Sequence, residues 1–178
     1  MKTVLIANGP IKNKGKLIDS CDVVIRMHHT DISEHVVHVG SKFDVWVAPY
    51  GHVQAWMNPP YEDIEKCSSV WSFNKKLGHA DRYLRTRVKN VTAASDLFKK
   101  FVGEFVPDAT PTKGFYALMM AMLIYDEPIY IAGFSFYKDN RSWFWSDKKR
   151  EPPLTGYNIP AEKMCIENLI KEGNVKWM

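Results

Sequence analysis

Residues 111–134, PTKGFYALMMAMLIYDEPIYIAGF, contain the pattern that decides the predicted fold. After Pro111 the sequence predicts a helix, in which apolar residues recur at helical spacing and should form one buried face: Leu118, Met119, Met122 and Leu123. Pro128 cannot continue a helix, so residues 129–132 are predicted to be a short buried strand. A helix that begins at a polar turn and leads into a strand is typical of α/β folds that bind anions, because the free amide groups of the first turn point at a phosphate.

The rest of the chain shows the same alternation of apolar strands and helices. Residues 4–7 form a predicted strand that stops at the turn Asn8-Gly9-Pro10. Further strands are expected at 23–27, around 44–48, at 69–73 and at 175–177, with helices beginning near Ser95 or Asp96 and covering 161–171. The fold class predicted is therefore α/β, a doubly wound, mostly parallel and Rossmann-like sheet with helices on both faces.

Composition supports a single compact domain over residues 1–178. The chain is 46% hydrophobic and carries a net charge of +4. It contains no run of eighteen apolar residues and no signal segment, so no membrane span is expected. Its three cysteines, Cys21, Cys67 and Cys165, have no CxxC spacing, so neither a disulfide framework nor a zinc site is predicted.

Two groups of residues resemble the large and small motifs of the sialyltransferases of glycosyltransferase family 29. The large motif has the form C-x-V-V-G-N-G/S, then G, I-D, D-x-V-x-R-x-N and D-V-G-x-K-T; the small motif has the form P-S-T-G-L-x-A-L, then L-C-D-E-V and Y-G-F. The first is matched by Asn8, Gly15, Ile18, Asp19, Asp22, Val24, Arg26, Val39, Gly40 and Lys42, and the second by Pro111, Gly114, Ala117, Leu118, Asp126, Glu127, Gly133 and Phe134. The resemblance implies a sialyltransferase-like fold that binds a nucleotide-activated sugar.

The resemblance also implies a set of donor-binding residues. They are Asn8, Gly9, Pro10, Arg26, His28, Thr112, Lys113, Gly114, Gly133, Phe134 and Ser135. His28 stands where the family usually has an Asn that touches the donor, and Lys113 replaces a neutral Thr and would favour a diphosphate. Each of these residues also has a simpler interpretation, as an ordinary turn, a satisfied polar side chain or a solvated lysine.

The catalytic base of the family is missing from this chain. In the family, a His five residues before a Glu takes the proton; here Tyr157 stands five residues before Glu162, and no His follows His79. A phenol with its ordinary pKa of about 10 is a poor base at neutral pH. The candidate catalytic residues are therefore Asp147, His28 and Tyr157, with Asp44 as a further possibility, unless the chain is catalytically inactive.

A long polar and aromatic segment, 136–158, is the predicted acceptor-binding region. Its candidate residues are Trp143, Trp145, Arg141 and Lys148. Aromatic rings beside cations are typical of proteins that hold single-stranded or flipped nucleotides. The same composition also suits a sugar, or an ordinary core.

The resemblance also has implications for the cellular compartment of the protein and for its need of a cofactor. Secreted members of the family join a Cys of the large motif to one of the small motif, and those positions hold Thr3 and Tyr125 here. A reducing cytoplasm, bacterial or phage-infected, is therefore expected. The family needs no metal, so neither a metal nor a cofactor is expected beside the nucleotide-sugar substrate.

The function predicted from the sequence is transfer of a sugar from a CMP- or UDP-type donor to an acceptor hydroxyl, without metal and with inversion. A hydroxymethylated base of phage DNA is the favoured acceptor, because basic residues cluster along the chain, for example at Lys75, Lys76 and residues 148–150. The alternatives are transfer to a bacterial surface glycan, and an inactive nucleotide- or DNA-binding protein.

Overall fold

The computed structural model of the chain describes residues 1–28, 32–48, 66–73, 88–126, 128–136 and 156–178. Seven strands form one sheet in the order β5-β4-β3-β2-β1-β6-β7, and every neighbouring pair is parallel. The strands are β1 (Thr3–Ile6), β2 (Val23–Met27), β3 (Val45–Val47), β4 (Ser69–Ser72), β5 (Asn90–Ala93), β6 (Ile129–Ala132) and β7 (Val175–Trp177). The predicted parallel α/β sheet is confirmed.

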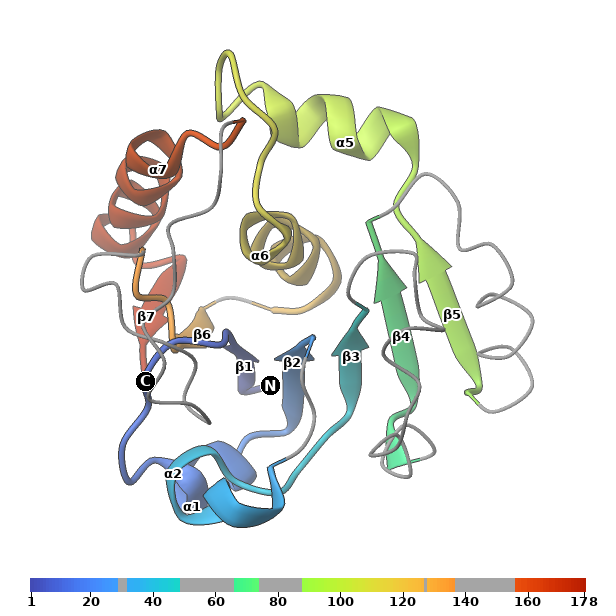
Figure 1. Cartoon of the computed structure of the whole chain (residues 1–178), viewed down its shortest axis with the longest axis vertical. Coiled ribbons are helices and arrows are strands. Elements are labelled where there is room, and N and C mark those ends of the chain that lie inside the picture. The colour runs from blue at the N-terminus through green and yellow to red at the C-terminus, as the bar shows by residue number, and fades with distance from the viewer. Residues whose placement is uncertain (29–31, 49–65, 74–87, 127, 137–155) are drawn as a thin grey trace.

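Helices cover both faces of this sheet (Figure 1). The helices α5 (Asp96–Gly103), α6 (Lys113–Ile124) and α7 (Ile159–Lys171) lie on one face. The short helices α1 (Gly15–Asp19) and α2 (Val36–Val39), with the 3-10 turn η1 (Ser33–His35), lie on the other. The chain winds from β1 outward to β5, then returns to place β6 beside β1, so the winding changes direction between β1 and β6.

The core is built around α6. Residues 115–121 of this helix are buried on all sides, because the sheet lies beneath the helix and α5 and α7 flank it. The expected apolar face is therefore only partly right: Leu118 is fully buried, but Leu123 is 66% exposed. The side-chain hydroxyl of Thr112 caps the helix by accepting a hydrogen bond from Phe115 N at 3.2 Å.

One strand was missed by the sequence analysis. β5 is the edge strand of the sheet, and its residues Asn90, Val91, Thr92 and Ala93 are exposed or half-buried. An edge strand needs no apolar run, so its sequence carries no hydrophobic pattern. None of the described helices is long and apolar enough to cross a membrane.

Candidate functional site

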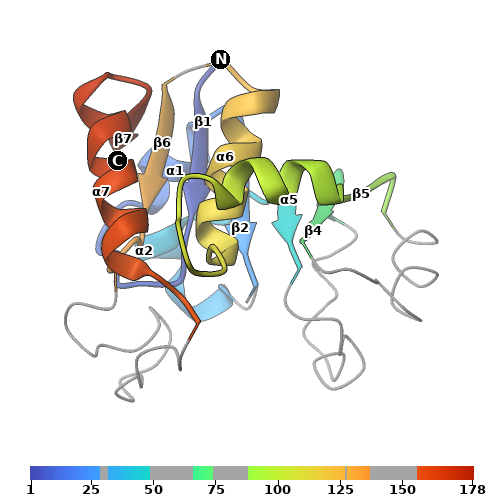
Figure 2. The ribbon, with the colours of Figure 1, turned by 90° about the horizontal axis from the view of Figure 1, so that it is seen from above.

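The candidate site lies at the edge of the sheet where the parallel strands end, which we call the carboxyl edge. It comprises the segments that follow β1, β2 and β6 together with the first turn of α6. Since α6 runs antiparallel to the strands, its N-terminus faces this edge (Figure 2). In doubly wound sheets, ligands bind at the carboxyl ends of the strands where the winding changes direction, which here is between β1 and β6.

The segments that follow β1 and β6 remain side by side beyond the sheet. Ala7 N donates to Ala132 O at 2.8 Å, and Gly9 N donates to Gly133 O at 2.8 Å. A Cβ atom on Gly9 would lie 2.4 Å from Gly133 O, and one on Gly133 would lie 2.4 Å from Ala7 O. Gly133 also has a φ of 72°, which disfavours any other residue. Both glycines are thus needed for the close approach of the two backbones.

Asn8 and His28 meet at this edge from neighbouring strands. The side chain of Asn8, 9% exposed, places its Nδ2 3.5 Å from His28 Nδ1. The His28 backbone has a φ of 54° and is held on both sides, since its N–H donates to Val47 O and its carbonyl accepts from Trp46 Nε1. With the Asn8 amide as donor, His28 Nδ1 is the acceptor, and the neutral ring then carries its proton on Nε2. In that tautomer Nε2 is a hydrogen-bond donor.

The first turn of α6 is held in place by a carboxylate from α7. Glu162 is 4% exposed; its Oε1 accepts from Thr112 N at 2.5 Å and its Oε2 accepts from Thr112 Oγ1 at 2.7 Å. Burial raises the pKa of Glu162 above its ordinary value, although the hydrogen bonds from Thr112 act in the opposite direction. The Thr112 hydroxyl is therefore engaged by Glu162 and Phe115.

Gly114 connects the helix start to the ends of two strands. A Cβ on this glycine would lie 3.4 Å from Cε1 of Phe134 and 3.6 Å from Sδ of Met27. Phe134 follows β6, and Met27 is the last residue of β2 and precedes His28. The two sequence segments from which the site was predicted thus reach one edge, with Asn8 and Gly114 both beside the end of β2.

Lys113 places a cation at the same helix start. Burial lowers the pKa of its ammonium group from the ordinary 10.5 to about 8. A phosphate bound at the free amides of the first turn would stabilise the charged form of this lysine.

The Arg26 side chain makes its hydrogen bonds with the connection between α2 and β3. Its guanidinium group donates from Nε to Lys42 O and from Nη2 to Val39 O, each at 2.8 Å. Burial lowers its pKa to about 10, although Asp19 and Asp44 favour the charged form. These contacts hold the connection between α2 and β3, so the site proposed below does not include Arg26.

Several other residues of the large motif belong to the same local network. Asp19 accepts hydrogen bonds from Ser41 N and Lys42 N, and a Cβ on Gly40 would lie 2.4 Å from Asp19 Oδ1. The ammonium group of Lys42 donates to the carbonyls of Cys21 and Asp22. Burial raises the pKa of Asp19, but the hydrogen bonds from Lys42 and Ser41 outweigh it and leave the pKa below its ordinary value. These contacts fasten α1 to the loop before β3.

The predicted catalytic and acceptor residues fall in two classes. Asp147, Trp143, Trp145, Arg141 and Lys148 lie outside the described residues. Tyr157 stands at the start of α7, between Gly156, whose carbonyl accepts from Thr110 N at 2.9 Å, and Asn158, whose side chain caps the helix. The chain at Tyr157 therefore lies beside the segment that leads into α6.

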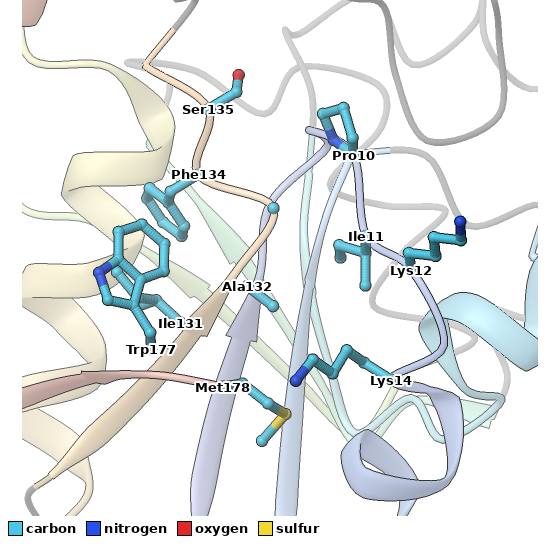
Figure 3. A pocket seen from close by; sticks show the side chains of 11 residues that line it. Pro10, Ile11, Lys12, Lys14, Ile131, Ala132, Phe134, Ser135, Trp177 and Met178 are labelled. Atoms are coloured by element: carbon cyan, nitrogen blue, oxygen red, sulfur yellow. The ribbon is translucent and has the colours of Figure 1, made fainter.

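A pocket of about 230 Å³ adjoins the carboxyl edge (Figure 3). We call it the Lys14 pocket; its lining includes four of the predicted donor residues, namely Pro10, Gly133, Phe134 and Ser135. The remaining lining residues are Ile11, Lys12, Lys14, Ile131, Ala132, Trp177 and Met178. Within the described part of the chain, no group of three His, Cys, Asp or Glu side chains could hold a metal ion.

Glu162 is the site residue whose role the sequence analysis missed. Its partner Thr112 lies 50 residues away in the chain. The available signal was its place in the first turn of a predicted helix, where an acidic residue is expected for electrostatic reasons, and that placement does not reveal a distant partner.

Comparison with known proteins gives one clear result. No protein-family profile matches the chain, and no curated protein matches its sequence. By structure it is similar to a mammalian sialyltransferase, with a TM-score of 0.74 and 16% identity over 99% of this chain and 68% of the other. It is also similar to a mammalian sialyltransferase in complex with Gal-beta-1-3GalNAc-ortho-nitrophenol, with a TM-score of 0.71 and 19% identity over the same shares. The likeness establishes a sialyltransferase-like fold.

Proposed function

We propose that this protein is a glycosyltransferase that moves a sugar from a nucleotide-activated donor, of the CMP or UDP type, to an acceptor hydroxyl. The observation that carries the proposal is the convergence of the Asn8–His28 pair and the first turn of α6 at one carboxyl edge. The sialyltransferase-like fold supports the same function.

In this proposal the nucleotide phosphate lies between the two halves of the edge. The amides of Lys113 and Gly114 point toward it from the helix start, and the Lys113 ammonium neutralises part of its charge. Asn8 and the Nε2–H of His28 hold its other side. Phe134, whose ring lies beside Gly114, bounds the space from the end of β6.

The reaction would be a direct displacement with inversion and without metal. The acceptor oxygen forms a bond to the anomeric carbon while the bond from that carbon to the phosphate oxygen breaks. The electron pair leaves with the phosphate, whose charge the groups at the helix start stabilise. The acceptor proton goes to a base, for which Tyr157 and Asp147 are the candidates because the resemblance places the base in that part of the chain.

A saccharide is the acceptor class that we propose. The DNA acceptor rests on basic clusters such as Lys75, Lys76 and residues 148–150 and on the aromatic residues Trp143 and Trp145, all of which lie outside the described residues. The Lys14 pocket, in contrast, adjoins the carboxyl edge and has the size of a sugar ring.

Incubation of the purified chain with a panel of CMP-, UDP- and GDP-sugars tests the proposal. We expect slow release of free nucleotide from one donor class, accelerated by an added acceptor. Nucleotide binding without turnover of any donor would instead identify an inactive nucleotide-binding protein. Absence of both binding and turnover would overturn the proposal.

A further inference from the structure

We infer that the Lys14 pocket binds an acidic monosaccharide unit, a sugar ring that carries a carboxylate or a phosphate group. The pocket lies at the carboxyl end of β6 between the loop that follows β1 and the end of β7 (Figure 3). The inference goes beyond the proposed function, because it names a second ligand site; only the assignment of this sugar to the acceptor rests on that function.

The size of the pocket restricts the ligand. Its volume of about 230 Å³ lies below the ~300–1,000 Å³ of cavities that enclose drug-sized ligands. A single sugar ring fits, whereas a stretch of duplex DNA needs a long, open surface. The size of the pocket therefore suits a single ring and not a stretch of duplex.

The lining of the pocket has two chemical parts. Ile11, Ala132 and Met178 present an apolar wall, which matches the C–H face of a sugar ring. The Lys14 side chain extends its ammonium group toward Ala132 and Met178, as Figure 3 shows. Ser135 adds a hydroxyl at the rim.

Among the described residues, those that line the pocket include two lysines and no acidic side chain. Lys12 and Lys14 line the pocket, and Lys16 follows on α1. The ion pairs between described residues involve other lysines, namely Lys42, Lys99 and Lys163. A carboxylate or phosphate on the ligand would supply the missing partner of Lys14.

The loop that carries Lys14 is held in position before any ligand binds. Asn13 N donates to His38 Nδ1 at 3.2 Å, and Lys14 N donates to His38 O at 3.1 Å. Lys14 precedes α1, and its side chain makes no capping hydrogen bond. The backbone from which the Lys14 side chain projects is therefore fixed by its hydrogen bonds to His38.

The pocket is joined to the carboxyl edge by the segment that follows β6. The Phe134 ring lies beside Gly114 at the edge, while Gly133, Phe134 and Ser135 line the pocket. A sugar in the pocket would thus lie next to a donor at the edge, as an acceptor must.

An NMR titration of the protein, labelled with ¹³C at its Ile and Met methyl groups, tests the inference. The variants I11V and M178L assign the signals of Ile11 and Met178. The ligands are methyl glycosides of glucuronic acid and N-acetylneuraminic acid, glucose 6-phosphate, neutral methyl galactoside, a short DNA duplex, CMP and UDP. We expect a saturable shift of both methyl signals with an acidic sugar, and binding of the neutral sugar about tenfold weaker. Comparison of the two carboxylate sugars with glucose 6-phosphate shows which acidic group the pocket binds more tightly.

Lys14→Gln should remove the preference for acidic sugars, whereas Lys16→Gln, which makes the same change of charge on the same segment outside the pocket, should keep it. The inference would be overturned by any of three results. The two variants could have equal effects, the DNA duplex could displace the sugar, or no acidic sugar could give a saturable shift. CMP or UDP binding that moves the Met178 signal as strongly would also overturn the inference. If nucleotide binding persists without sugar binding, the inference fails and the proposed function stands.

Discussion

The carboxylate of Glu162 receives two hydrogen bonds from Thr112, one from its backbone N–H and one from its hydroxyl. A carboxylate and a hydroxyl each cost free energy when they are removed from water without a hydrogen-bond partner. Paired with each other, Glu162 and Thr112 fasten the start of α6 to α7. Because the amides of the next two residues form the proposed phosphate site, this pair fixes the direction in which those amides point.

Glu162→Ala should destabilise the protein by about 3 kcal/mol, because it removes a buried carboxylate and leaves two half-buried donors of Thr112 without this partner. The free energy of unfolding in urea measures the effect. Glu167→Ala is the matched control on the same helix, where an exposed pair with Lys163 at 3.3 Å is removed; its effect should stay within about 0.5 kcal/mol. Similar losses in the two variants would contradict the role of Glu162.

Gly133→Ala should destabilise the protein by roughly 2–4 kcal/mol, because the new Cβ meets Ala7 O at 2.4 Å and φ is positive. Thermal and urea unfolding measure the loss. In Gly103→Ala the new Cβ has no neighbour within 4 Å, so that variant should be neutral or slightly stabilising. An unaffected Gly133 variant would mean that the segments after β1 and β6 do not need their close approach.

Asn8→Ala should weaken nucleotide binding by about tenfold, because it removes one polar contact to the phosphate and releases His28 Nδ1. Calorimetric titration with the preferred nucleotide measures the change. Asn168→Ala, on an exposed position of α7, should bind as the natural chain does. Unchanged affinity in the Asn8 variant would remove Asn8 from the site.

The lowered pKa of Lys113 predicts how nucleotide affinity depends on pH. Its pKa of about 8 in the free protein should rise when a phosphate binds, so the charged form is bound more tightly. Affinity should be nearly constant below pH 8 and fall by up to about tenfold per pH unit above it. Lys113→Met should bind more weakly at pH 7 and lose this decline. The same decline in Lys113→Met would assign the titration to another group.

The alternation of apolar segments was sufficient to predict the parallel sheet and most of its elements, because strands buried on both faces have continuous apolar runs. It was not sufficient for β5, whose exposed residues carry no such run. The burial of α6 on all sides likewise depends on α5 and α7, which no local pattern reveals.

The candidate site was predictable where it depends on chain order and not where it depends on distant partners. Asn8, His28 and Gly114 were named from the family resemblance, at positions that follow strands or open a helix, and the structure brings them to one edge. Arg26 was named from the same resemblance, yet its guanidinium is bound by the carbonyls of Val39 and Lys42, a contact that only the folded chain creates.

A crystal soaked separately with CMP and UDP tests the central claim most directly. The account predicts a nucleotide at the carboxyl edge, with its phosphate within hydrogen-bond distance of the Gly114 amide and of the Asn8 or His28 side chain. A nucleotide bound elsewhere, or none at this edge while solution binding is measurable, would contradict the account.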